Sequence, residues 1–183
     1  LSSTAQTWLM VTIRTYSISF SEQTVTVPAL AGYTAEGDTT PLTHNYPYNL
    51  TSASYFIQWS EDEEADSEDS LLGTLRPDDF SLSVATNYLV NLTENSTSGE
   101  MMLVFDVLES IPENLVLSFG SVEEVNAYLF QSGYTSAKGQ GIWDTTITCN
   151  NAPSIGFLID LDDGNDWVLF VEYTYYSGTI IEL

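Results

Sequence analysis

Two β-rich runs flank a short acidic turn between residues 154 and 176, and this stretch most limits the possible folds. Alternate positions of the first run, from Ile155 to Leu161, are apolar, which is the period of a strand with one buried face. The second run, residues 167–171, is apolar at every position, which predicts a central strand covered on both faces. The intervening DDGND predicts a tight turn. A long antiparallel hairpin is therefore expected, with the rest of the chain layered onto it.

Further runs rich in β-branched and aromatic residues are separated by Gly, Pro and Asn turn signals. Strands are predicted over residues 8–20, 24–30, 53–60, 80–92, 101–108, 115–119, 142–149 and 178–183. The run 101–108 is apolar on both faces and is expected to be a central strand. Pro28 predicts that 24–30 lies at a sheet edge or ends there. Residues 31–50 contain several glycines and prolines and are predicted to form a loop.

One short helix is expected after Ser121, because Ser121 and Glu124 match a capping box. Val122, Val125, Leu129 and Tyr128 would share its apolar face, and the helix would end by Gly133. The predicted fold class is all-β: a single jelly roll or antiparallel β-sandwich with one short helix. It would form one domain over residues 1–183, with an acidic loop insertion near 60–70.

The charge balance is the second constraint. The chain has 26 acidic residues against 3 basic ones and a formal net charge of −23. Most carboxylates therefore lack a cationic partner and repel one another, which destabilises a compact state unless salt screens the repulsion. At roughly 1 M salt the Debye length is about 3 Å, so the repulsion is largely removed. The composition favours a protein of concentrated brine, and an acidic secreted domain in calcium-containing medium is the alternative.

The same charge argues against direct nucleic-acid binding and against anionic membrane surfaces, since both carry phosphate. No apolar run approaches the roughly 20 residues of a transmembrane segment. The one cysteine, Cys149, excludes an internal disulfide framework, and it is expected to be a small buried residue. His44, the one histidine, is interpreted as a polar loop residue. No nucleophile motif accompanies it, so no catalytic residue and no enzymatic activity are predicted.

The acidic turn offers one candidate metal site, formed by Asp160, Asp162 and Asp166. The spacing departs from a calcium loop of the EF-hand type, because Gly164 stands at the fifth position where an acid is needed. A structural cation held by these carboxylates stays a hypothesis, and the turn alone also explains the residues. No other cofactor is predicted.

Two further motifs point outward. Asn49, Asn91 and Asn95 begin glycosylation sequons near predicted loops or strand ends, as suits an outward-facing protein. Tyr46 and Tyr48, and the tyrosines at 173, 175 and 176, are candidates for contact surfaces, since such aromatics are enriched at interfaces and at sugar sites.

The predicted strands 8–20, 101–108 and 167–176, the deficit of basic residues and the acidic run 61–69 together resemble a viral protein family. It is the small major capsid protein of haloarchaeal icosahedral viruses with an internal membrane. The resemblance implies a single jelly roll standing upright in the shell of the virion. It also implies partners: copies of the chain itself and a larger jelly-roll capsid protein. A shell separated from its genome by a bilayer needs no basic inner face.

The functional hypothesis is therefore a structural capsid protein of a halophilic virus, in an assembly stabilised by salt. The alternative is a secreted, extracellular carbohydrate-binding β-sandwich module of a halophile. An acid-tolerant glycosidase and a fibre or spike component are further alternatives.

Overall fold

The computed structural model describes residues 12–59, 78–86, 91–107, 111, 113–135, 137–151 and 164–183. Within these ranges, two antiparallel sheets form a β-sandwich with one short helix, which confirms the predicted fold class. The elements are β1 (Arg14–Ala35), β2 (Thr39–Tyr46), β3 (Leu50–Trp59), β4 (Asp79–Ala85), β5 (Leu92–Ser96), β6 (Glu100–Asp106), β7 (Asn114–Phe119), α2 (Val122–Gln131), β8 (Gly141–Asn151) and β9 (Gly164–Glu182).

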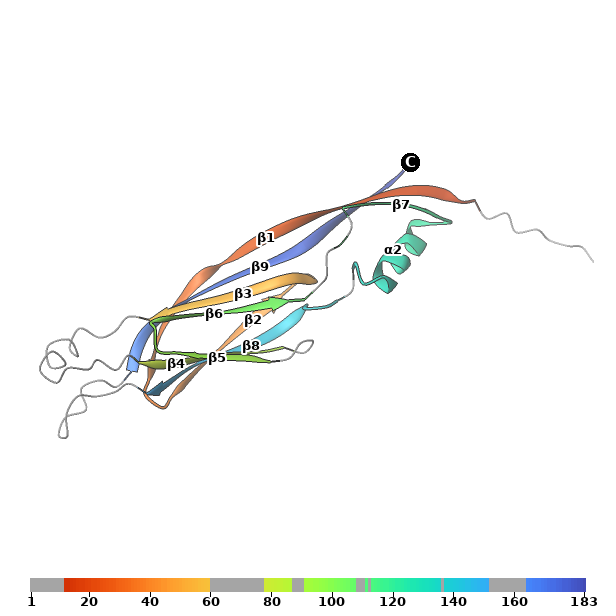
Figure 1. Cartoon of the computed structure of the whole chain (residues 1–183). Coiled ribbons are helices and arrows are strands. Elements are labelled where there is room, and N and C mark those ends of the chain that lie inside the picture. The colour runs from red at the N-terminus through yellow and green to blue at the C-terminus, as the bar shows by residue number, and fades with distance from the viewer. Residues whose placement is uncertain are drawn as a thin grey trace, which may run out of the picture. The chain divides into compact units, whose positions relative to one another are not determined.

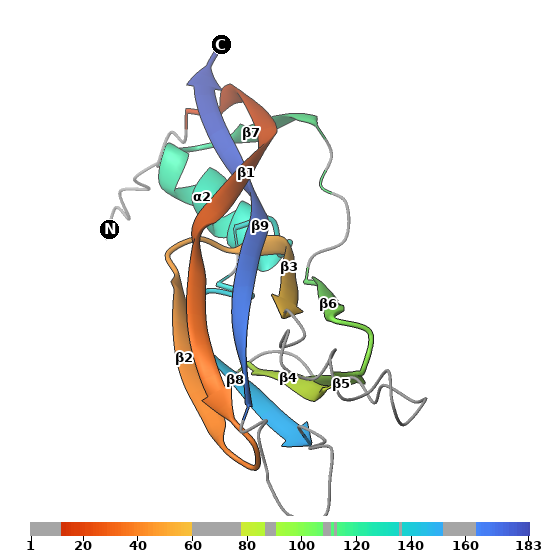
Figure 2. The same ribbon diagram turned by 90° about the vertical axis from the view of Figure 1, so that its left-hand side faces the viewer.

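The strand order pairs early strands with late ones. Sheet A has the order β6-β3-β9-β1-β7, and sheet B has the order β2-β8-β4-β5. Figures 1 and 2 show the long strands β1 and β9 side by side. With β7 set aside, the pairs β1–β9, β2–β8, β3–β6 and β4–β5 are nested one inside the next. The eight described strands of these pairs therefore follow the nested pairing order of one long hairpin, divided between the two sheets.

Contacts divide the chain into two compact units. Unit 1 comprises Leu1–Ser21, Ser110–Ser136 and Tyr176–Leu183, and unit 2 comprises Glu22–Glu109 and Ala137–Tyr175. Each unit has its own hydrophobic core. The strands β1 and β9 run through both units, since each unit takes a part of each strand.

The core of unit 2 follows from strand alternation. On β3, every second residue from Ala53 to Trp59 is buried, and β4 contributes Phe80, Leu82 and Val84 in the same way. Aromatic rings fill the space between the sheets; for example, the ring centroids of Tyr46 and Trp143 are 5.0 Å apart in an edge-to-face arrangement.

In unit 1, Tyr16, Ile18 and Phe20 of β1 pack with Val125 and Leu129 of the helix. The predicted capping box is present: the Ser121 hydroxyl accepts a bond from the Glu124 amide, and the Glu124 carboxylate accepts one from the Gly120 amide. Gly133, at φ 80°, ends the helix as expected. The proposed apolar face is partly wrong, because Val122 and Tyr128 are exposed.

Three strand predictions need correction. Strand β6 is an edge strand with one buried face, and β9 is central but also leaves one face to solvent, so neither is covered on both faces. The predicted loop 31–50 contains the end of β1 and all of β2. Pro28 does lie at an edge position, since β7 pairs with β1 only over residues 14–19. The predicted strand 155–161 and the acidic insertion 60–70 lie outside the described residues.

Candidate interaction surface

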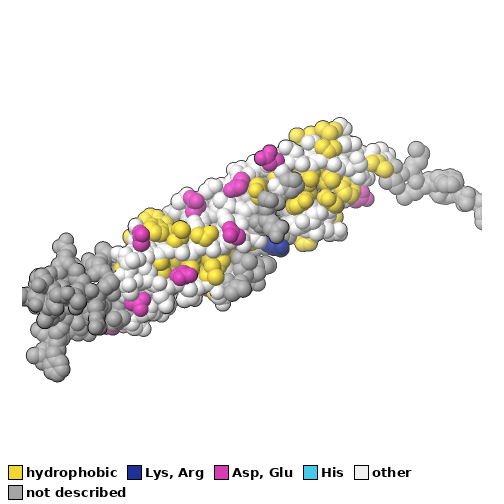
Figure 3. All heavy atoms as spheres, in the orientation of Figure 1, with side chains coloured by type: hydrophobic (Ala, Val, Ile, Leu, Met, Phe, Trp, Pro, Cys, Tyr) yellow, Lys and Arg dark blue, Asp and Glu magenta, His cyan; other side chains and the backbone are white. Residues whose placement is uncertain are grey.

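The outer face of sheet A carries a group of exposed apolar side chains within unit 2. We call it the apolar patch; its members are Phe56 of β3, Met102 and Val104 of β6, and Val168 and Phe170 of β9. Met102 is 59% exposed, Val104 49% and Phe170 39%, while Phe56 and Val168 are half-buried. In Figure 3, hydrophobic side chains gather where Figure 1 shows these strands.

Strand register makes the patch continuous. Phe56 lies directly opposite Met102 on one side and opposite Phe170 on the other. Directly opposite residues have Cβ atoms about 4.5–5.5 Å apart, so the three side chains form a row across three strands. The rings of Phe56 and Phe170 are stacked with centroids 6.1 Å apart. Since the row starts on an edge strand, it extends to one border of sheet A.

Carboxylates and neutral polar groups surround the apolar patch. Glu100 accepts a bond from the Gln58 amide at 3.5 Å, and Glu172 accepts one from the Thr26 hydroxyl at 3.4 Å. Asp106 ends β6 on the same face. If a second copy of the chain docked on this face, the carboxylates around the two patches would repel one another. Contact therefore needs salt that screens this repulsion.

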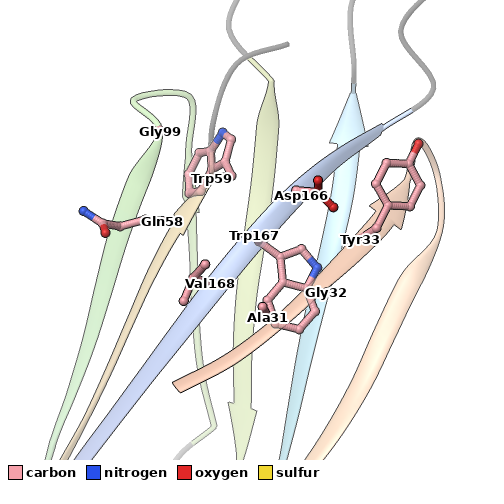
Figure 4. Close-up of a pocket in the computed structure, with 9 residues that line it drawn as sticks. All are labelled: Ala31, Gly32, Tyr33, Gln58, Trp59, Gly99, Asp166, Trp167 and Val168. Atoms are coloured by element: carbon pink, nitrogen blue, oxygen red, sulfur yellow. The ribbon is translucent and has the colours of Figure 1, made fainter. Parts of the chain in front are cut away.

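A shallow groove lies at one end of unit 2 (Figure 4). Residues of β1, β3 and β9 line it, and Val168 belongs both to the apolar patch and to the groove. Its volume is about 740 Å³, and Tyr33, Gln58, Trp59, Asp166 and Trp167 are among its lining residues. Both indoles are buried, so they form the floor and offer little ring face for stacking. Tyr33, at 47% exposure, is the accessible aromatic side chain of the groove.

The candidate metal site is only partly described. Asp160 and Asp162 lie outside the described residues, and Asp166 is an exposed residue of β9 that lines the groove. Within the described ranges, no group of three His, Cys, Asp or Glu side chains is placed to hold a metal ion. The cation therefore stays a hypothesis.

His44 is not the polar loop residue that its neighbours suggested. It lies on β2, is 7% exposed, and its ring is 5.5 Å from that of Tyr55 in an edge-to-face arrangement. Its pKa is lowered by burial. His44 lies opposite Trp143, and Cys149 is six residues further along β8, which is about 20 Å at strand spacing. The geometry therefore keeps these two side chains apart. Cys149 is fully buried, as predicted.

The tyrosines divide into a buried and an exposed set. Tyr46 and Tyr173 are buried, so their proposed role in contact surfaces is wrong. The Tyr46 and Tyr55 hydroxyls share a buried hydrogen bond of 2.6 Å, and burial raises the pKa of Tyr55 to about 12. Tyr48 is exposed and stacks on Tyr175, with ring centroids 4.1 Å apart. This surface pair joins the two segments that the sequence had singled out separately.

Sequence reasoning missed the apolar patch. Met102 and Val104 were assigned to a strand covered on both faces. The lack of polar residues at alternate positions was, however, also a signal of an exposed apolar face. An apolar run of this kind fits a strand buried by the rest of the chain, and it also fits one whose second face is exposed.

The comparisons with known proteins add no relative. No protein-family model matches the chain, and a search of curated proteins found no similar sequence. Among the described residues, the structure has no helix long and apolar enough to cross a membrane. For the part of the chain that the structure describes, the findings thus establish an antiparallel β-sandwich with one short helix, and no family is assigned to the chain.

Proposed function

We propose that the chain is a structural subunit of the shell of a halophilic virus, which associates with copies of itself and with a larger jelly-roll capsid protein. The observation that carries this proposal is the apolar patch on the outer face of sheet A. Exposed apolar patches on soluble domains mark interaction sites when they are contiguous and rimmed by polar groups.

The strand order supports the jelly-roll part of the proposal. In a jelly roll, eight strands form two Greek keys in two packed sheets. The nested pairs β1–β9, β2–β8, β3–β6 and β4–β5 supply eight such strands, four in each layer. Strand β7 and helix α2 follow β6 in the chain and belong to unit 1, as an addition to the eight-stranded pattern.

The charge supports a second copy as the partner at the apolar patch. With a net charge of −23, two copies repel each other over most of their surface in dilute buffer. The centre of the patch is uncharged, so apolar contact there adds a favourable term once salt screens the carboxylates at its rim. Association would therefore be weak in dilute buffer and strong in concentrated salt.

Sedimentation velocity of the purified chain in molar salt and after dilution tests this proposal. We expect oligomers in molar salt and monomers, folded or unfolded, in dilute buffer. Electron microscopy of the high-salt sample then distinguishes capsomer-like rings or clusters from fibres. A stable monomer under both conditions would count against a shell subunit, and a trimer would favour a fibre or spike component.

A carbohydrate-binding module is the second candidate, and the stacked pair of Tyr48 and Tyr175 favours it. Exposed aromatic rings can cover the apolar face of a sugar. The groove around Tyr33 and Asp166 lies at the other end of the pairing of β3 with β9, so it is a separate candidate site. A glycan array with the wild-type chain and with Tyr48→Ala and Tyr33→Ala variants tests it. Binding that either variant abolishes would support this function over a shell subunit.

A further inference from the structure

The three glycosylation sequons do not have equivalent surroundings. Asn49 lies directly before β3, is half-buried and precedes Leu50, which is fully buried. Asn91 lies directly before β5 and is exposed, and Asn95 is an exposed residue of β5 itself. The structure thus separates one poorly accessible sequon from two accessible ones.

The geometry of β5 turns its two sequons outward. β5 is the edge strand of sheet B and pairs with β4 alone in the sheet (Figure 1). Leu92 packs against the core, so alternation places Thr93 and Asn95 on the opposite, outer face. The Thr93 hydroxyl confirms this, because it contacts the Ser83 hydroxyl of β4 at 2.8 Å on that face.

Both asparagines present the reactive atom. The Asn95 Oδ1 accepts a bond from the Ser81 hydroxyl at 2.7 Å, and the Asn91 Oδ1 accepts one from the Thr86 amide at 3.2 Å. Each side chain is therefore held by its oxygen. The Nδ2 atom of each makes no hydrogen bond with the described part of the chain, and Nδ2 is the atom that N-glycosylation modifies.

We propose that Asn91 and Asn95 are N-glycosylation acceptors and that Asn49 is not, in the folded protein. The donor would be a lipid-linked oligosaccharide. A bond forms between Nδ2 and the anomeric carbon of the sugar, and the bond from that carbon to the lipid phosphate oxygen breaks. The lipid phosphate leaves with the electron pair, and Nδ2 loses one proton.

Glycans at these positions would have a physical consequence for association. They would cover the outer face of sheet B beside a free strand edge, and such an edge otherwise invites pairing with other chains. The apolar patch lies on the outer face of the other sheet of the sandwich, so it would stay uncovered. The proposal does not depend on the function proposed above.

Secretion of the full chain from a haloarchaeal host, followed by intact-mass and glycopeptide analysis, tests the proposal. We expect glycan on the peptide that contains Asn91 and Asn95. Thr93→Ala should remove the glycan at Asn91 alone, and Thr97→Ala should remove that at Asn95 alone. The matched variant Thr51→Ala, which disrupts the sequon of Asn49, should leave the mass of the glycans unchanged.

Two results would overturn the proposal. One is a secreted, folded chain without glycan at Asn91 and Asn95 in a culture whose own surface glycoprotein is modified. The other is a glycan at Asn49 on chain that folded before it met the transferase. A second measurement uses purified unmodified chain with an oligosaccharyltransferase and its lipid-linked donor. Folded chain should react at Asn91 and Asn95 only, whereas chain unfolded beforehand should also react at Asn49; equal reaction at Asn49 in both states would contradict the assignment.

Discussion

Replacing Met102 with threonine tests whether the apolar patch carries self-association. Full burial of a methionine side chain contributes about 1.5–3 kcal/mol. Met102 is 59% exposed in the single chain, so about 1.5 kcal/mol per copy becomes available when a partner covers it. In a two-fold symmetric contact both copies lose this contribution, and about 3 kcal/mol weakens the dissociation constant about 100-fold.

The assay is sedimentation equilibrium in molar salt over a range of protein concentrations. Threonine is β-branched and suits a strand, and Met102 is an exposed position, so the free energy of unfolding of the monomer should change by no more than about 0.5 kcal/mol. Ile142→Thr is the matched control. Ile142 is 57% exposed on β8 of sheet B, and its substitution should leave association unchanged.

Two outcomes would contradict a role of the apolar patch in self-association. If Met102→Thr associates as strongly as the wild type, the apolar patch is not the contact surface. If Ile142→Thr weakens association equally, the effect reflects general surface hydrophobicity and not this face. Phe170→Thr serves as an independent member of the same patch and should reproduce the effect of Met102→Thr, because both side chains flank Phe56.

Four other measurements test the energetics. Dilution from about 1 M to about 0.1 M salt should lower the free energy of unfolding, measured by urea titration, because the Debye length grows from about 3 to about 10 Å. Below pH 6.5, the free energy of unfolding should fall as the pH falls, because burial lowers the pKa of His44 and the unfolded chain therefore binds the proton more readily than the folded chain. This dependence of the free energy of unfolding on pH should disappear in His44→Gln. Tyr55→Phe should lower the free energy of unfolding by about 1–3 kcal/mol, because the buried Tyr46 hydroxyl loses its hydrogen-bond partner. The double variant Tyr46→Phe and Tyr55→Phe should recover most of this loss. Gly32→Ala should lower the melting temperature, as its Cβ would lie 2.5 Å from the Trp167 ring.

The outcomes that would contradict these expectations are specific. Stability that is independent of salt would mean that the carboxylates do not repel one another appreciably. A pH slope that survives in His44→Gln would have to come from other groups. A double Tyr→Phe variant as unstable as Tyr55→Phe alone would show that the lost hydroxyl bond is not the cause.

The fold class could be predicted because local signals agreed with tertiary structure. The capping box of Ser121 and Glu124 specifies the helix start by itself, and alternation in 53–59 and 80–84 specifies two strands with one buried face. These signals need only neighbouring residues. For that reason these local signals predict the elements correctly without any knowledge of what packs against them.

Strand β2 could not be predicted because its signals conflict. Pro41 and the polar THN sequence indicate a loop, yet Pro41 fits in β2 because β2 is an edge strand and its missing amide can face away from β8. His44 is polar by type and buried by position, with aromatic rings as its neighbours. Only the pairing with β8, about a hundred residues away, reveals that this face points inward.

The two outer faces of the sandwich differ in chemistry, and this difference bears on assembly. Sheet A presents the apolar patch, whereas sheet B presents hydroxyls and carboxamides that bond one another, as Asn150 does with Ser81 and Ser83 does with Thr93. In a chain with so few basic residues, ion pairs cannot hold two copies together. Within unit 2, apolar area is then the main adhesive term, and the apolar patch contains three of the strongly exposed apolar side chains, Met102, Val104 and Phe170. A contact between two such faces is closed by two-fold symmetry, so at this face it favours discrete pairs of chains over open filaments. Exposed apolar side chains of unit 1, such as Val116 and Phe130, leave further surface for other contacts.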